Sequence, residues 1–226
     1  MSDTDSFIDE VNEEVRRDRL FGYLRRYGWI GATVLVLVIG GAGFLEYRKA
    51  QAEAQAQALG DAMLQALANN DAAAQAAALR ALEAGGSESA AMLAFMLANA
   101  EAEAGNTDAA VAALQSVENA ADLPLAYRQF AAFRVLLMQG DSLDPATRRA
   151  RFSELAVPGL DYRLLAEEQL ALIDIETGDT EAAIARYRAI TQDAEASAGL
   201  QQRAVQAIVA LGGTLDETGG SDSDGK

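Results

Sequence analysis

The sequence GNTDAA at residues 105–110 returns as GDTEAA at residues 178–183, and this recurring stretch decides the fold. Each copy follows one long amphipathic segment and opens another. Glycine is the usual residue in the left-handed conformation that ends a helix, while Thr and Asp cap the start of the next one. The acidic residue then lies beside the positive N-terminus of the second helix. The stretch therefore predicts two helices joined by a tight turn.

Two weaker copies extend this pattern into a repeat. One begins at Gly140, and a remnant, ANNDAA, begins at Ala68, so the four starts are 37, 35 and 38 residues apart. The sequence between them is rich in alanine and shows no alternation of period two, which disfavours strands. We predict an all-α chain in which each unit buries an apolar stripe, for example Phe130, Phe133 and Leu137, against its neighbour.

Proline positions help to set the predicted helix boundaries. Pro124, Pro145 and Pro158 lie where the apolar periodicity breaks, as expected for a residue that cannot continue a helix from inside. The last helix would cap the array, and the tail at 212–226, rich in Gly, Ser and Asp, is predicted to be disordered. The predicted helices are 46–69, 71–84, 87–104, 107–119, 124–139, 145–156, 161–177, 180–194 and 196–211.

An uncharged stretch, YGWIGATVLVLVIGGAGFL, lies between Arg26 and Glu46. As a helix, residues 27–45 cover roughly 28 Å, close to the ~30 Å hydrocarbon core of a bilayer. Tyr27 and Trp29 lie at one end and Tyr47 at the other, where aromatic rings favour the headgroup level. We predict a single transmembrane helix. A buried core helix and a cleaved signal peptide are the alternatives, although a signal peptide usually has a shorter leader and a shorter apolar core.

The cationic residues around this span predict its orientation. Five arginines precede it, including Arg25 and Arg26, whereas only Arg48 and Lys49 follow closely. Positive residues resist translocation, so we expect residues 1–26 to form a cytoplasmic leader and residues 46–211 an exported domain. The leader fits either a short amphipathic helix or a solvated, partly ordered segment.

The composition excludes most catalytic chemistry. The 226 residues include no His and no Cys, which removes the imidazole base, the thiolate nucleophile and the soft metal ligands. The acidic run around Gly178 does not match an EF-hand loop, since Gly178 would stand fifth and Ala185 twelfth. We therefore assign this run, which includes Asp174, to a solvated helix end. We expect no enzyme activity, no metal, no cofactor and no small-molecule substrate.

The charge balance narrows the choice of partner. The chain has 34 Asp and Glu against 18 Lys and Arg, a net charge of −16, and the part after residue 26 has 27 acids against 13 bases. Such a charge repels nucleic-acid backbones and anionic lipid. A protein-binding surface is the remaining possibility.

The period and the paired helices resemble the tetratricopeptide repeat, a helix-turn-helix unit of about 34 residues whose second helix carries Ala-x₃-Phe. Ala183 and Tyr187 fit that pattern, while the family's Trp and Tyr landmarks on the first helix are absent. The resemblance implies a degenerate helical-hairpin solenoid with a groove lined by the first helix of each unit. A purely packed or solvated role is the alternative for each groove position. The implied groove positions are Asn99, Tyr127, Arg134 and Glu168.

The order of leader, anchor ending in Leu45-Glu46-Tyr47-Arg48, and acidic tetratricopeptide-like domain resembles the YfgM family over roughly residues 7–211. The resemblance implies a non-enzymatic ancillary subunit of the SecYEG translocon that links it to periplasmic chaperones or emerging clients. It also implies a single pass through the bacterial inner membrane, with the N-terminus in the cytoplasm and the domain in the periplasm. The alternative is a tetratricopeptide scaffold for another envelope assembly or division complex.

The predicted topology can be tested with a reporter enzyme that works only outside the cytosol. Fused after Leu211 and produced in a bacterial host, it should be active, because the arginines before the span hold the N-terminus inside. A matched fusion of a reporter that works only in the cytosol should be inactive. Activity of the second fusion alone would contradict the topology.

Overall fold

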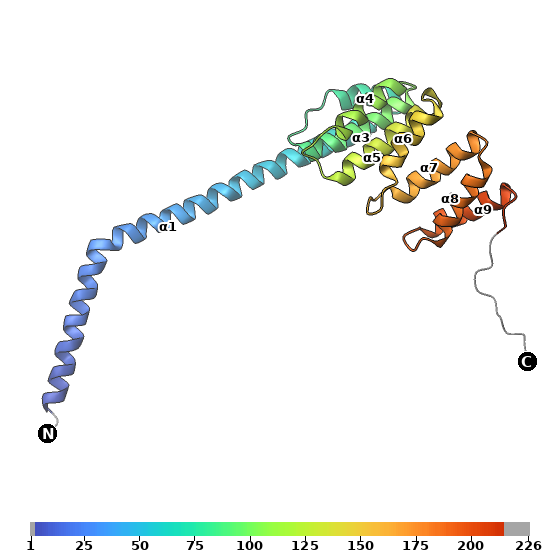
Figure 1. Cartoon of the computed structure of the whole chain (residues 1–226). Helices are drawn as coiled ribbons and strands as arrows, with labels where there is room; N and C mark the ends of the chain where they lie inside the picture. Colours follow the sequence, from blue (N-terminus) through green and yellow to red (C-terminus); the bar gives the residue numbers. More distant parts are fainter. Residues whose placement is uncertain (1–2, 215–226) are drawn as a thin grey trace, which may run out of the picture. The chain divides into compact units, whose positions relative to one another are not determined.

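The computed structural model describes the backbone of residues 3–214 and the side chains of residues 29, 30 and 33–214. Within residues 3–214 all regular secondary structure is helical, which confirms the predicted all-α class (Figure 1). A short 3-10 helix, η1 (Gly140–Ser142), follows α5 directly. The α-helices are α1 (Asp3–Leu67), α2 (Ala72–Arg80), α3 (Ser87–Glu103), α4 (Thr107–Glu118), α5 (Leu125–Gln139), α6 (Pro145–Leu155), α7 (Arg163–Glu176), α8 (Thr180–Gln192) and α9 (Ala198–Ala210).

The chain divides into two units, Met1–Ala58 and Leu59–Lys226. We call the second one the helical unit. It begins within α1, at Leu59, whereas the sequence analysis placed the start of the domain at Glu46. In the first unit the side chains of residues 33–58 are all exposed, including the large apolar ones from Val34 to Leu45.

The described residues contain no helix with the length and apolar character that crossing a membrane requires. The predicted span, residues 27–45, includes residues 27, 28, 31 and 32, whose side chains lie outside the described set. The side chains of the predicted leader and the tail residues 215–226 lie outside it as well. The anchor, its orientation, the leader and the disorder of the tail therefore stay predictions.

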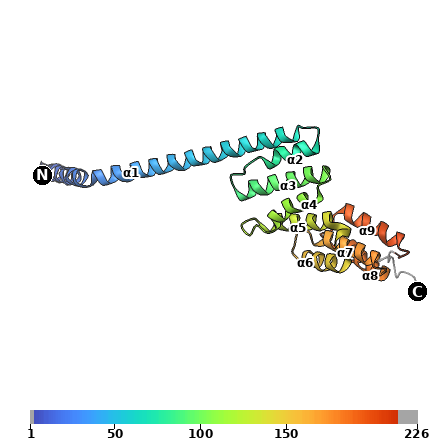
Figure 2. The ribbon, with the colours of Figure 1, turned by 90° about the horizontal axis from the view of Figure 1, so that it is seen from above.

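Three-helix clusters form the core of the helical unit. Each cluster joins the two helices of one hairpin to the first helix of the next hairpin. The clusters combine the end of α1 and α2 with α3, then α3 and α4 with α5, then α5 and α6 with α7, and finally α7 and α8 with α9. Figure 2 shows α2, α3, α4 and α5 succeeding one another in this order. Each hairpin therefore buries its apolar stripe against the hairpin that follows it.

The ends of the helices lie within two residues of the predicted boundaries, with two exceptions. The helix predicted at 46–69 is the last part of α1, which begins at Asp3. The sequence predicted a helix at 71–84, but α2 ends at Arg80 because Leu82 turns back onto the cluster around Met63 and Leu79. Side-chain caps explain several starts. Asp71, Asp144, Asp179 and Ser197 each accept a hydrogen bond from the backbone N–H three residues later.

The two strong copies of the repeat end their first helices in the same way. Gly105 and Gly178 have φ angles of 81° and 83°, in the left-handed region. The next residue donates its backbone N–H to a carbonyl five residues earlier, from Asn106 to Glu101 and from Asp179 to Asp174, each at 2.8 Å. The left-handed helix end predicted from the glycine is therefore confirmed, and its bond pattern is that of a Schellman motif. In the weaker copy Gly140 has a φ of 41°, and the chain enters η1 instead.

Replacing Gly178 with alanine should lower the free energy of unfolding by about 1 kcal/mol, since a side chain makes the left-handed conformation unfavourable. Gly60, inside α1 with open space around its Cα, provides the control. Gly60→Ala should leave stability unchanged or raise it by up to about 1 kcal/mol, because alanine favours helix. Urea unfolding of both variants measures the difference. A Gly178→Ala variant as stable as the parent would contradict this account of the turn.

Candidate functional site

Helices α3, α5 and α7 present equivalent side chains when they are aligned on Gly105, Gly140 and Gly178. Positions thirteen, ten and six residues before each glycine share one helical face, because they are three and four residues apart. None of these nine residues is buried, whereas the residues seven before each glycine are all buried. We call this set the α3–α5–α7 face, and it consists of Met92, Phe95, Asn99, Tyr127, Phe130, Arg134, Leu165, Glu168 and Leu172.

Aromatic rings connect the three helices along this face. The ring centroid of Phe95 lies 5.0 Å from that of Phe130 and 6.4 Å from that of Tyr127. Phe130 in turn stacks on Tyr162, the residue before α7, at 5.8 Å. Burial, together with the nearby charge of Asp161, raises the pKa of Tyr162 above its ordinary value, so its hydroxyl is neutral at neutral pH. All four rings remain partly exposed, so a ligand can reach them.

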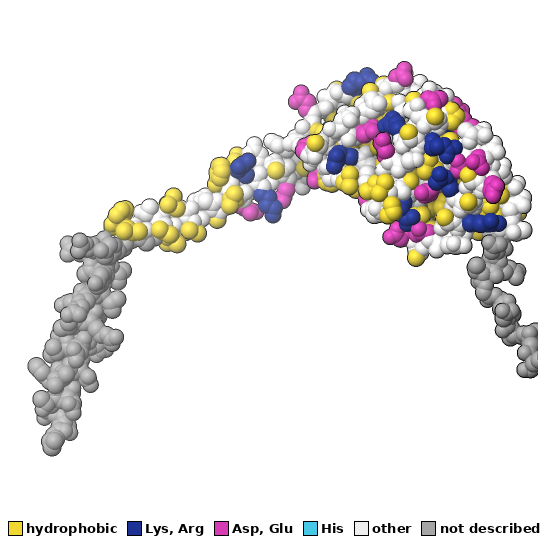
Figure 3. Space-filling model, in the orientation of Figure 1, with side chains coloured by type: hydrophobic (Ala, Val, Ile, Leu, Met, Phe, Trp, Pro, Cys, Tyr) yellow, Lys and Arg dark blue, Asp and Glu magenta, His cyan; other side chains and the backbone are white. Residues whose placement is uncertain are grey.

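The surface of the helical unit is mixed in character. Figure 3 shows hydrophobic side chains between arginine and acidic side chains on the helical unit. The guanidinium of Arg134 lies 5.8 Å from the centroid of the Phe130 ring, which is a cation–π distance. Residues 59–214 contain ten Arg and no Lys. Among the described side chains, seven of these arginines lie within 4.0 Å of a carboxylate, and Arg134 is not one of them.

The four groove residues predicted from the sequence all belong to the α3–α5–α7 face. Tyr127 and Arg134 lie on either side of Phe130 along α5, and Asn99 is exposed at the equivalent place to Arg134 on α3. Glu168 has a different setting. Its carboxylate accepts hydrogen bonds from Nε and Nη2 of an arginine on α9, Arg203, both at 2.8 Å. The structure therefore places Tyr127 against the Phe95 ring and Arg134 against the Phe130 ring, leaves Asn99 exposed on α3, and ties Glu168 to the last helix.

The sequence analysis missed Phe95 and Tyr162 and misplaced Phe130. It assigned Phe130 to a buried stripe with Phe133 and Leu137, but only Phe133 is buried, and Leu137 is 47% exposed. The reason is that α5 packs against α3 and α4 through Ala131 and Val135 and against α6 and α7 through Phe133 and Leu136, and neither packed side includes Phe130 or Leu137. A signal was available, because Phe95 precedes Gly105 by the same ten residues by which Phe130 precedes Gly140.

The predicted flanks of the membrane anchor are described only in part. Arg25, Arg26 and Tyr27 have side chains outside the described set. Trp29 and Tyr47 are both exposed. These observations leave the flanking roles as predictions.

A buried carboxylate lies close to the first strong turn. Glu101, four residues before Gly105, has no exposed surface. It accepts hydrogen bonds from Arg80, at the end of α2, and from Nδ2 of Asn106 at 2.9 Å. The contact joins one hairpin to the next and also fixes the turn that follows α3.

The second strong turn also has a buried carboxylate that accepts hydrogen bonds from arginine. Asp174, four residues before Gly178, is 2% exposed and accepts hydrogen bonds from Arg149 of α6 and from Nε of Arg186 of α8, the latter at 2.8 Å. The assignment of Asp174 to a solvated helix end was therefore wrong. Its partners lie 25 and 12 residues away in the sequence, so local spacing could not reveal them.

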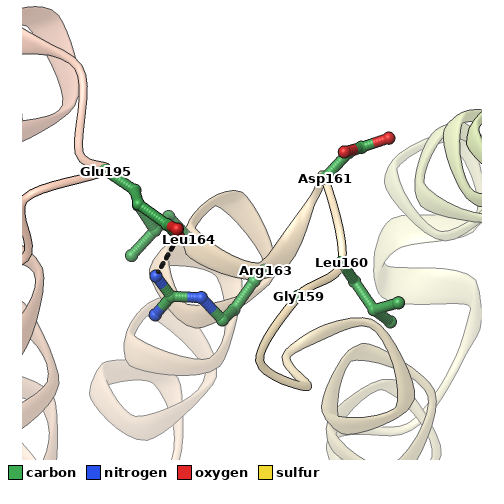
Figure 4. Close-up of a pocket in the computed structure, with 6 residues that line it drawn as sticks. All are labelled: Gly159, Leu160, Asp161, Arg163, Leu164 and Glu195. Atoms are coloured by element: carbon green, nitrogen blue, oxygen red, sulfur yellow. Dashed lines mark hydrogen bonds and ion pairs between the residues drawn. The ribbon is translucent and has the colours of Figure 1, made fainter.

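Two cavities lie near the start of α7, and the arginines that line them already pair with carboxylates. One, of about 260 Å³, is lined by Arg163, Leu164 and Glu195, with Gly159, Leu160 and Asp161 (Figure 4). Arg163 donates to Glu195 at 2.7 Å and to Asp193 at 2.8 Å, and these bonds raise the pKa of Arg163. The other, of about 300 Å³, shares Arg163 and Leu164 and is lined also by Arg186, which pairs with Glu167.

Neither cavity holds a group of side chains that could bind a metal ion, within the described residues. In residues 29, 30 and 33–214 there is no group of three acidic, His or Cys side chains that could hold a metal ion. The comparisons with known proteins are also silent: no family model, curated protein or solved structure matches the chain. We take the α3–α5–α7 face as the candidate site because its partly exposed rings on α3 and α5 form one row with Tyr162, the residue before α7.

Replacing Asp174 with asparagine should lower the free energy of unfolding by about 3 kcal/mol, because two arginines lose their buried counter-charge. Glu176, on the same helix, provides the matched control, since it pairs with Arg148 but is exposed. Glu176→Gln should cost less than about 1 kcal/mol. Denaturant unfolding measures both. Equal losses would mean that burial of Asp174 contributes little.

Proposed function

We propose that this chain is a non-enzymatic, membrane-anchored protein-binding module whose α3–α5–α7 face receives a segment of a partner protein. The row of partly exposed rings that this face forms with the adjoining Tyr162 carries the proposal. Phe95, Tyr127, Phe130 and Tyr162 hold one another in place, so a ligand meets preorganised aromatic surface and few side chains must become ordered on binding. Surfaces of this kind are typical of protein-binding sites.

The packing of the helical unit also supports a binding role. Each hairpin is fixed by the next one, so the three helices keep their relative positions along the array. The buried ion pairs of Glu101 and Asp174 also fix the register between neighbouring hairpins. An extended segment or a helix could then contact equivalent positions on α3, α5 and α7 in succession.

The uncharged run at 27–45 supports the anchored part of the proposal. An anchor would keep the helical unit close to partners in the same membrane, so that weak contacts suffice at high effective concentration. The resemblance to the YfgM family suggests the SecYEG translocon and periplasmic chaperones as those partners. The acidic surface would favour basic partner regions, chiefly by raising the association rate.

A tetratricopeptide scaffold for another envelope assembly or division complex is the alternative function. It would use the same anchor and the same face. The two functions differ in the identity of the partner, so an experiment in intact membranes is needed to separate them.

Photo-crosslinking from the full chain in bacterial membranes tests the proposal. A crosslinkable residue at Asn99, on the α3–α5–α7 face, should capture a protein partner. The same crosslinkable residue at Ser116, which is exposed on α4, should capture several-fold less protein. The reason is that α4 is the second helix of its hairpin and does not belong to the α3–α5–α7 face.

The captured proteins decide between the two functions. Translocon subunits or periplasmic chaperones would support the first proposal, and components of an assembly or division complex would support the alternative. If Asn99 captured no protein beyond the Ser116 level, the proposed binding face would be wrong.

A further inference from the structure

We infer that the segment bound by the α3–α5–α7 face carries an aromatic side chain and, two residues further on, an acidic side chain that pairs with Arg134. This inference rests on the proposed function and states which chemistry the face selects. It commits to an internal segment of another protein.

The charge of Arg134 is the first argument. Among the described side chains it has no carboxylate within ion-pair distance, although seven of the ten arginines in the helical unit do. The unit is rich in acids, since residues 59–214 contain 21 of them. An arginine left without one in such surroundings keeps its bidentate donors available to a ligand carboxylate.

The position of Arg134 is the second argument. Its guanidinium lies against the Phe130 ring, in the middle of the row formed by Phe95, Tyr127, Phe130 and Tyr162. A ligand carboxylate at Arg134 therefore stands next to an aromatic surface that favours another ring by edge or offset stacking.

Distance sets the spacing of the two ligand groups. The Arg134 guanidinium and the Phe130 ring centroid are 5.8 Å apart. In an extended peptide, side chains two residues apart point to the same side and are separated by about 6.8 Å. Phe-x-Glu in an extended segment matches this separation.

The continuation of the face beyond Arg134 argues for an internal segment. On α7 the equivalent positions hold Leu165, Glu168 and Leu172, and Leu172 is 46% exposed. A chain that ended at Arg134 would leave this apolar surface uncovered. Glu168 is neutralised by Arg203, so it does not repel the acidic ligand side chain strongly.

The test uses the full chain in detergent and a labelled twelve-residue peptide, acetylated and amidated, with one Phe-x-Glu and two lysines. Fluorescence anisotropy measures the dissociation constant of this peptide for the parent protein and for Arg134→Gln. The dissociation constants of a second peptide, with Gln in place of Glu, are measured for the same two proteins. Replacing either charge should weaken binding about tenfold, and replacing both should weaken it no further, because the two charges act on each other.

Arg128→Gln is the matched control. Arg128 is also on α5 but six residues earlier, and so on another side of the helix. This variant should retain the tenfold preference for Glu over Gln. Loss of the preference in Arg128→Gln would overturn the inference, as would an effect of Arg134→Gln that is equal for both peptides.

Two further peptides separate this inference from the proposed function. A peptide with Ala in place of Phe should not bind detectably. Equal binding of the Glu and Gln peptides to the parent, with loss of binding in the Ala peptide, would overturn the acidic requirement but keep the binding face. Tighter binding of a peptide that ends in Phe with a free carboxylate would overturn the internal segment. Failure of the proposed function would appear separately, as absence of crosslinks from Asn99.

Discussion

The helical unit depends on one constraint: a pair of short helices cannot bury its apolar stripe alone. Each core cluster therefore includes a third helix, which follows the hairpin in the chain. These third helices are α3, α5, α7 and α9. Alanine at buried positions such as Ala98, Ala110, Ala171 and Ala183 keeps the helices close. The same rule leaves one side of α3, α5 and α7 without a covering helix, and that side holds the candidate site.

Buried polar contacts fix the register between the packed helices. Apolar stripes rich in alanine specify a register weakly, because many offsets bury similar area. Glu101 and Asp174 each accept hydrogen bonds from an arginine of the preceding hairpin, and a slip of the helices would leave a buried carboxylate without its partner. The two acids stand at the same place before their turn glycines. In the weaker copy this place is taken by the buried Leu136, so apolar packing holds that junction.

The candidate site follows from these features in physical terms. Rings on α3, on α5 and just before α7 touch one another because the hairpins are fixed, and all four rings are only partly covered by the described residues. Seven of the ten arginines in the helical unit pair with a carboxylate, and Arg134 differs from the other two, Arg128 and Arg188, in lying against an aromatic ring among the described side chains. This acidic protein thus presents one positively charged side chain, Arg134, beside aromatic rings. That side chain can select an acidic ligand group even though the overall negative charge favours basic partners.

The sequence by itself determined the helical class, the turns and nearly all the helix boundaries, because glycine turns, capping residues and apolar periodicity are local signals. It also located Asn99, Tyr127, Arg134 and Glu168 on one face, since equal spacing from a turn means an equal position on the helix. Only the tertiary structure decided that Asp174 is buried, that Phe130 stays partly exposed and that Glu168 is tied to Arg203. These facts depend on side chains from other hairpins, between 12 and 35 residues away, whose approach no local pattern records.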